Sequence, residues 1–285
     1  MFAIIGTVPE TDVPVLVGEA TKEFQQIVVG GQRFPINRGT PALLAAAIQV
    51  CRALGEPLPV AYLVGDIGLG DGSRRLYHFL TGEIGRTNFD VIAFHYLQPD
   101  VDWHNRVNFA IEEMTRRPVL IADAGFMYAA KMSGEAAAYD LFTPDIGELA
   151  FLADEEAPHP FYTRGFIIHK ENEVEKLIAR AYRFGNAAKH LLVKGSRDYI
   201  ACEDGILEIV DQPGTEAMEA IGGTGDTLTG IVAALVNYGM TVREASVKGA
   251  KINRIAGVCA MPTPATQIAE IIEQIPSAMK EIFRI

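Results

Sequence analysis

The segment with the clearest chemical potential reads Gly222-Gly223-Thr224-Gly225-Asp226-Thr227-Leu228-Thr229-Gly230 and runs into an apolar stretch. Glycines let a backbone turn tightly and approach a ligand closely, and the first N–H groups of the expected helix point at the same loop. Gly223, Thr224 and Gly225 are therefore predicted to form an anion hole for a phosphoryl group. Asp226, in the first helical turn, is the expected catalytic base, because a carboxylate there can accept a hydroxyl proton. The alternative is that Asp226 only caps the helix and the glycines only make a tight connection.

Two common nucleotide-binding signatures are missing. The chain has no GxxxxGK[ST] segment and no GxGxxG after an expected strand. The segment 65–72 carries glycines at 68, 70 and 72, which is the wrong spacing for a dinucleotide site, and we interpret it as a flexible loop. A P-loop enzyme and a Rossmann dehydrogenase are both disfavoured.

The rest of the chain alternates short β-branched runs with amphipathic or apolar helical patterns, which favours an α/β fold with a mainly parallel sheet and helices on both faces. Ligands in such folds bind beyond the carboxyl ends of the strands. We expect one domain over residues 1–285, with Thr40 as helix N-cap, Pro41 at the first helical position and a loop around 158–160. The expected strands are 27–31, 60–64, 90–94, 118–122, 139–143, 190–193, 198–202 and 206–210, and the expected helices are 40–54, 74–80, 105–116, 147–153, 171–188, 225–238, 242–260, 265–274 and a tail from 276.

The composition of the chain limits the classes of protein to which it can belong. The 285 residues are 49% hydrophobic and 21% charged, which is ordinary for a globular protein with a large core. The net charge of −11 disfavours nucleic acid and anionic membrane as partners, although backbone N–H groups can still hold a small phosphorylated ligand. Three cysteines without a CxxC pair predict reduced thiols and no zinc–thiolate site. Residues 1–12 lack the features of a signal peptide, so we expect a cytoplasmic location.

The GGTGD segment opening a helix resembles the anion hole and catalytic aspartate of the ribokinase-like superfamily, whose fold is a three-layer sandwich. Within it, the chain is most similar to the ADP/ATP-dependent NAD(P)H-hydrate dehydratase family, from about residue 27 to the C-terminus. The matching segments, in chain order, are Gly30-Gly31-Gln32, Gly39-Thr40-Pro41, Asp123-Ala124, Thr143-Pro144-Asp145-Ile146-Gly147-Glu148, Leu192-Val193-Lys194-Gly195-Ser196, the GGTGDTLTGI segment, Ala265-Thr266-Gln267-Ile268 and Ile275-Pro276-Ser277-Ala278.

This resemblance implies a small-molecule substrate, ATP or ADP, Mg²⁺, and a homo-oligomer. Asp226 would activate the substrate hydroxyl toward the terminal phosphoryl group, and Glu148 would organise Mg²⁺ directly or through water. Alternatively, Glu148 is only a first-turn helix carboxylate and Lys194 only a solvated strand end. The resemblance places four residues on the nucleotide side: Lys194, Gly195, Ser196 and Asn253. Of these, Asn253 would also approach the base. Asp123 and Gly39 are expected on the substrate side, with His95 and Asp100 as weaker candidates there.

The chain departs from that family on the substrate side. The family's TPHPGE segment is TPDIGE here, and the glycine-rich loop expected after the strand 90–94 is replaced by His95-Tyr96-Leu97-Gln98-Pro99-Asp100. Residues 64–70 also faintly resemble a VGDDxFG segment of sugar kinases. Three hypotheses therefore stand: a dehydratase of hydrated NADH or NADPH, a small-molecule kinase for an alcohol, and a non-catalytic nucleotide sensor. A sensor would have no use for a base at Asp226.

Overall fold

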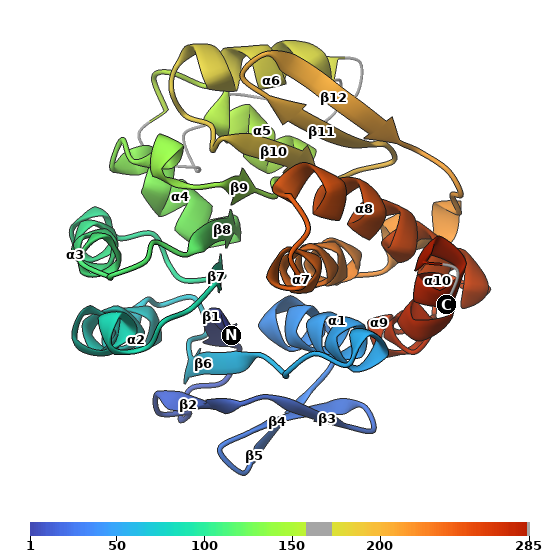
Figure 1. Ribbon diagram of the computed structural model, residues 1–285, viewed down its shortest axis with the longest axis horizontal. Coiled ribbons are helices and arrows are strands. Elements are labelled where there is room, and N and C mark those ends of the chain that lie inside the picture. Colours follow the sequence, from blue (N-terminus) through green and yellow to red (C-terminus); the bar gives the residue numbers. More distant parts are fainter. Residues whose placement is uncertain (158–172, 284–285) are drawn as a thin grey trace.

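A nine-stranded sheet forms the centre of the computed structural model, which describes residues 1–157 and 173–283 (Figure 1). The predicted loop at 158–160 and the first residues of the helix expected from 171 lie outside this range. The strand order is β12-β11-β10-β9-β8-β7-β1-β6-β2. Six neighbouring strands are parallel: β1 (Phe2–Val8), β6 (Val60–Gly65), β7 (Val91–His95), β8 (Val119–Asp123), β9 (Leu141–Phe142) and β10 (His190–Val193). The antiparallel strands β2 (Leu16–Glu19), β11 (Asp198–Cys202) and β12 (Gly205–Val210) form the edges.

Helices cover both faces of the sheet, so the predicted α/β class is confirmed (Figure 1). One layer holds α1 (Gly39–Leu54), α7 (Thr224–Asn237), α8 (Val242–Cys259), α9 (Ile268–Ile272) and α10 (Ile275–Phe283). The other holds α2 (Asp71–Glu83), α3 (Val101–Glu112), α4 (Ala124–Met132), α5 (Ile146–Leu152) and α6 (Val174–Arg183). Within the described ranges, no helix has both the length and the apolar character that crossing a bilayer demands.

Several local predictions were wrong. The central strand β1 and the helix α4 were not predicted from the sequence, and the strand expected at 27–31 lies outside the main sheet. It forms β4 (Gln26–Val29) of a separate small sheet with β3 (Thr21–Glu23) and β5 (Gln32–Pro35). Strand β1 is buried along its whole length, so it shows no alternation of polar and apolar residues from which a strand could be recognised.

Two further expectations concern the N-cap of helix α1 and the loop at residues 65–72. Helix α1 begins at Gly39 with Arg38 as N-cap, so Thr40 is not the cap and its hydroxyl is free for another contact. The segment 65–72, interpreted as a flexible loop, contains a bend whose backbone is held by one carboxylate. The Asp66 carboxylate accepts hydrogen bonds from the N–H groups of Gly68, Gly70 and Ser73 at 2.8–3.1 Å.

Helices α1 and α7 pack in close contact with each other on one face of the sheet. A Cβ atom at Gly230 would lie 2.2 Å from the carbonyl oxygen of Leu43 on α1. Only glycine therefore permits the observed distance between the two backbones.

We predict that Gly230→Ala lowers the free energy of unfolding by about 1–3 kcal/mol or more, because α1 and α7 must move apart. The matched control is Gly82→Ala on α2, where a Cβ atom meets nothing within 4 Å. That change is expected to stabilise the protein by about 0.5–1 kcal/mol. Denaturant unfolding of both variants measures the difference, and equal stabilities would contradict the close crossing.

Candidate functional site

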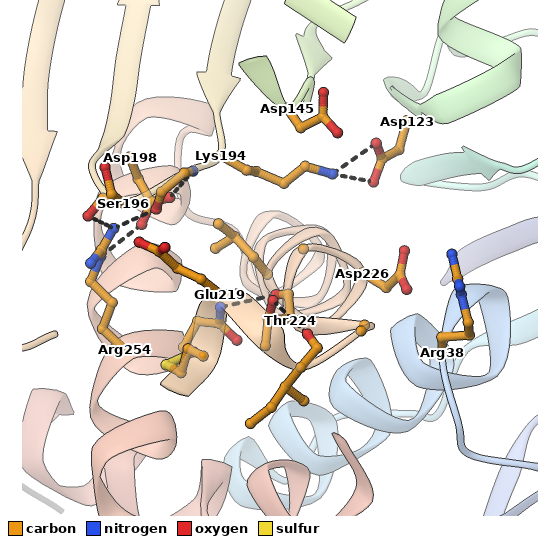
Figure 2. A pocket seen from close by; sticks show the side chains of 18 of the residues that line it. Arg38, Asp123, Asp145, Lys194, Ser196, Asp198, Glu219, Thr224, Asp226 and Arg254 are labelled. Carbon is orange, nitrogen blue, oxygen red and sulfur yellow. Dashed lines mark hydrogen bonds and ion pairs between the residues drawn. The ribbon is translucent and has the colours of Figure 1, made fainter. Parts of the chain in front are cut away.

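A cavity of about 700 Å³ opens where the carboxyl ends of β7, β8 and β10 face the N-terminus of α7 (Figure 2). Most of the predicted site residues line it although they are far apart in sequence: Asp123, Glu148, Lys194, Gly195, Ser196, Gly223, Thr224, Gly225, Asp226 and Asn253. Gly39 joins them through a hydrogen bond to Asp226. Asp100 does not line the cavity; its carboxylate instead accepts from the N–H of Trp103 as the N-cap of α3.

Asp226 lies in the first turn of α7, as predicted, but it does not cap that helix. The N-cap is Gly223, whose φ of 100° is a left-handed conformation that favours glycine. The Asp226 carboxylate points away from α7 and bonds to two other elements. Its Oδ2 accepts from the Gly39 N–H at 2.6 Å, and its Oδ1 lies 3.1 Å from Nε2 of His95. The alternative that Asp226 is merely a helix cap is therefore wrong.

The surroundings of Asp226 keep it ionised although its side chain is buried. Burial raises the pKa of this carboxyl, but the hydrogen bond and charge of His95, the nearby Lys194 ammonium and the Gly39 N–H together lower it below its ordinary value. An ionised carboxylate at neutral pH can accept a proton. The arrangement thus meets the first requirement of a general base.

Lys194 and Asp123 form an ion pair in the cavity close to Asp226 (Figure 2). Lys194 Nζ lies 2.9 Å from both carboxylate oxygens of Asp123, and the Thr229 hydroxyl donates to Oδ2 at 2.7 Å. Burial lowers the pKa of Lys194, but the charges of Asp123 and Glu148 outweigh it and the net shift is upward, so the ammonium stays charged. Only 11% of the Lys194 side chain is exposed, which rules out the alternative of a solvated strand end.

Glu148 both takes part in capping a helix and lines the cavity. It forms a capping box with Asp145 at the start of α5, so it is a first-turn helix carboxylate as the alternative held. It also lines the cavity, where the Tyr128 hydroxyl donates to its Oε1 at 3.2 Å. Burial and the charge of Asp123 raise its pKa to about 8. Its carboxylate oxygens are hard ligands of the kind that Mg²⁺ prefers, and one such group beside waters and nucleotide phosphates fits a Mg²⁺ site.

Asn253 contacts the start of α7. Its Oδ1 accepts from the Thr227 hydroxyl at 2.7 Å, and its Nδ2 donates to the carbonyl oxygen of Thr224 at 3.1 Å. Among the described residues no hydrogen bond joins Asn253 to Asp226, so its approach to the base stays a prediction. Its amide ties α8 to the first turn of α7, beside the predicted anion hole.

The sequence analysis missed Arg254, a buried cation on α8. Its Nε donates to Asp198 at 2.8 Å, and its Nη2 donates to the carbonyl oxygens of Gly195 and Ser196 at 3.1 and 3.0 Å. Arg254 thereby holds the turn after β10, which forms one cavity wall (Figure 2). The sequence signal that could have identified Arg254 is its place between the apolar residues Ile252 and Ile255, on a helix that was expected to pack against the rest of the fold.

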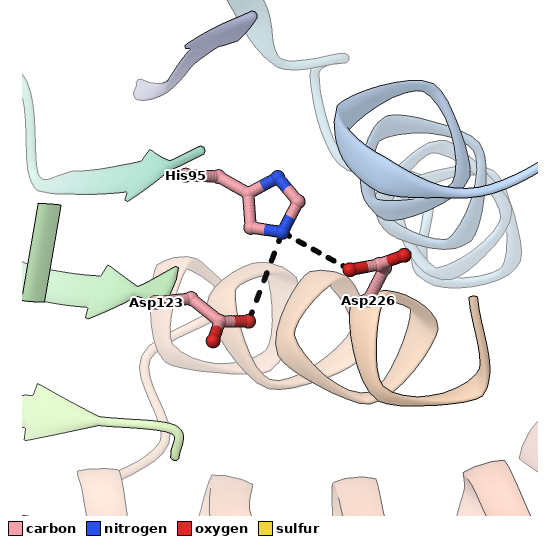
Figure 3. A group of neighbouring side chains, drawn as sticks. All are labelled: His95, Asp123 and Asp226. Atoms are coloured by element: carbon pink, nitrogen blue, oxygen red, sulfur yellow. Dashed lines mark hydrogen bonds and ion pairs between the residues drawn. The ribbon is translucent and has the colours of Figure 1, made fainter. Parts of the chain in front are cut away.

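His95 was only a weak candidate, yet it lies between the two carboxylates. Polar atoms of His95, Asp123 and Asp226 lie within 4.8 Å of one another (Figure 3). Such a trio can resemble a metal site. Here, however, Lys194 already compensates the charge of Asp123, and His95 Nε2 is closer to Asp226 (3.1 Å) than to Asp123 (3.8 Å). The group is therefore best described as a charge-compensated hydrogen-bond cluster.

We predict that Arg254→Met lowers the free energy of unfolding by about 3–5 kcal/mol, because it leaves the Asp198 carboxylate buried without its cation. The double variant Arg254→Met/Asp198→Leu should lose less, since no uncompensated charge remains. Arg243→Met, at an exposed position of the same helix, should change stability by less than about 0.5 kcal/mol. Denaturant unfolding compares the three variants. A single variant no less stable than the double variant would refute the role of the ion pair.

Comparisons with known proteins agree with this geometry. Residues 99–277, more than half of the chain, match the family model described as NAD(P)H-hydrate dehydratase. An uncharacterized protein of Methanocaldococcus jannaschii is 42% identical over 243 residues, which cover 85% of this chain and 100% of the relative. The bifunctional NAD(P)H-hydrate repair enzyme of Pyrobaculum aerophilum is 28% identical over 198 residues, which cover 67% of this chain but only 36% of that enzyme.

Solved structures show the same fold. The ADP/ATP-dependent NAD(P)H-hydrate dehydratase of Bacillus subtilis, co-crystallized with ATP/Mg²⁺, aligns with a TM-score of 0.58 and 16% identity over 99% of this chain and 89% of that chain. The fold is therefore ribokinase-like, as the GGTGD segment predicted. The family model covers the strands β8 to β12 and the whole of α7. This chain therefore belongs to the NAD(P)H-hydrate dehydratase family.

Proposed function

We propose that this protein is a nucleotide-dependent dehydratase that phosphorylates and then dehydrates the hydrated nicotinamide of NADH or NADPH. The observation that carries the proposal is the ionised, buried Asp226 carboxylate at the N-terminus of α7, facing a cavity of about 700 Å³. A carboxylate beside a turn that is predicted to bind phosphate can accept the proton of a hydroxyl that attacks the phosphorus.

In the first step, the substrate hydroxyl oxygen attacks the terminal phosphorus of the nucleotide, and the bond from that phosphorus to the rest of the nucleotide breaks. Asp226 takes the hydroxyl proton. The N–H groups of Gly223, Thr224 and Gly225 lie in the turn where α7 begins, the place from which backbone donors stabilise a charged phosphoryl group. The Lys194 ammonium beside Gly225 adds positive charge to the same region.

In the second step, the carbon–oxygen bond of the phosphorylated hydrate breaks and phosphate leaves with the bonding electrons. The lone pair of the ring nitrogen supplies the replacement bond, and loss of a proton from the neighbouring carbon restores the reduced nicotinamide. A kinase would share the first step and omit the second. The cofactor is ATP or ADP with Mg²⁺, in keeping with the name of the Bacillus subtilis enzyme and its ATP/Mg²⁺ complex.

The test mixes the protein with hydrated NADH, Mg²⁺ and either ATP or ADP, and follows the near-ultraviolet absorbance of reduced nicotinamide. We expect recovery of NADH that requires the nucleotide. Asp226→Asn should fold normally and lose about 10²- to 10⁴-fold or more of the rate, because the base is gone. Asp102→Asn, at an exposed position of α3, is the control and should keep the full rate.

An Asp226→Asn rate within tenfold of the parent would refute the assignment of the base. Nucleotide binding without recovery of NADH would refute the dehydratase and favour a kinase, to be sought with a panel of alcohols. Nucleotide binding without turnover of any member of that panel would favour the nucleotide sensor.

A further prediction concerns Glu148. Glutamine also completes a capping box, so Glu148→Gln should preserve α5 while removing the charged oxygen donor. We expect the Mg²⁺ concentration for half-maximal rate to rise by about 10- to 100-fold. Glu112→Gln, at an exposed position of α3, should leave it unchanged. A Mg²⁺ titration at saturating nucleotide measures both, and equal requirements would remove Glu148 from the metal site.

A further inference from the structure

His95 is the last residue of β7, and its imidazole is fully buried with both ring nitrogens engaged. Nε2 lies 3.1 Å from Oδ1 of Asp226, and Nδ1 lies 3.0 Å from the hydroxyl of Thr40. An ionised carboxylate can only accept, so Nε2 carries the hydrogen toward Asp226. Nδ1 pairs with the Thr40 hydroxyl on the other side of the ring. A hydroxyl on α1, an imidazole on β7 and a carboxylate on α7 thus form one chain of hydrogen bonds, of which Figure 3 shows the imidazole and the carboxylate.

The order hydroxyl, imidazole, carboxylate resembles a hydrolytic triad, but burial excludes that role. The Thr40 side chain is 0% exposed, so no substrate can reach its hydroxyl. A nucleophile must be open to the cavity. The accessible end of the chain is Asp226, which lines the cavity and keeps free lone pairs on its carboxylate.

The neighbouring backbone is adapted to this arrangement. Gly6 on β1 pairs in register with His95, and a Cβ atom there would lie 2.5 Å from the Thr40 hydroxyl and 2.6 Å from the His95 carbonyl oxygen. Tyr96 has a φ of 55°, a left-handed conformation that is rare for a non-glycine residue. The Thr7 hydroxyl donates to its carbonyl oxygen at 3.0 Å. Strained residues held by their surroundings concentrate at functional sites.

We propose that His95 is a positioning residue: braced by Thr40, it holds Oδ1 of Asp226 so that the carboxylate faces the substrate hydroxyl. The Gly39 N–H holds the other oxygen, Oδ2, at 2.6 Å. Two donors from different elements therefore fix the orientation of the base before substrate binds. This inference rests on the proposed function, because it assigns His95 a task in the same phosphoryl-transfer step.

The test compares His95→Leu, which removes both hydrogen bonds, with His95→Gln, whose amide can still donate to Asp226. We expect kcat to fall by about 10- to 100-fold in His95→Leu with unchanged KM for the nucleotide, because the base is present but misplaced. His95→Gln should restore most of that loss. Thr40→Val should lower kcat less, and adding it to His95→Leu should cost nothing more, because both changes break one chain.

Thermal unfolding and nucleotide binding show whether each variant is folded, and His78→Leu on the exposed face of α2 is the control for histidine removal. Equal rates for His95→Leu and His95→Gln would overturn the inference. Crystal structures of both variants give a readout without turnover: the Asp226 carboxylate should keep its orientation in His95→Gln and rotate away in His95→Leu. If no substrate is turned over, the proposed function fails while this structural comparison still decides the role of His95.

Discussion

Two carboxylates, Asp123 and Asp226, lie buried on the floor of one cavity, and the fold has to compensate both charges. Removing such groups from water is costly unless cations or hydrogen-bond donors replace the lost solvation. Lys194 compensates Asp123 through two contacts of 2.9 Å, and Thr229 adds a hydroxyl. His95 and the Gly39 N–H compensate Asp226. Every one of these partners comes from a different strand end or helix, so the site exists only in the assembled fold.

The same constraint explains the packing of the helices around the site. Asp226 meets Gly39 only if α7 and α1 begin next to each other, and the two helices cross closely enough that Gly230 contacts the Leu43 carbonyl oxygen. On the other side of α7, Asn253 of α8 binds the carbonyl oxygen of Thr224 and the hydroxyl of Thr227. The turn that carries the predicted anion hole is therefore held from both neighbouring helices. Preorganised donors of this kind need no rearrangement when charge develops on a phosphoryl group.

The cavity has a predicted nucleotide side and a predicted substrate side, and the two differ in how closely their sequences resemble the family's motifs. The predicted nucleotide side, from Lys194 to Ser196 and from Gly223 to Asp226, consists of segments that resemble the family's motifs, and Arg254 holds its turn through the Gly195 and Ser196 carbonyl oxygens. The substrate side departs from those motifs at residues 95–100, and there the structure places a buried imidazole against the base.

The sequence alone determined the features that depend on local backbone chemistry. The alternation of strands and helices predicted the α/β class, and the GGTGD segment predicted Asp226 in a helix first turn, because glycine at a left-handed position such as Gly223 is a local requirement. Only the tertiary structure decided the contacts between distant segments. His95 and Asp226 are 131 residues apart and Arg254 and Asp198 are 56 apart, and no local pattern encodes either pairing. The central position of β1 was likewise hidden, since a strand buried on both faces lacks the alternation of polar and apolar residues that would mark its period.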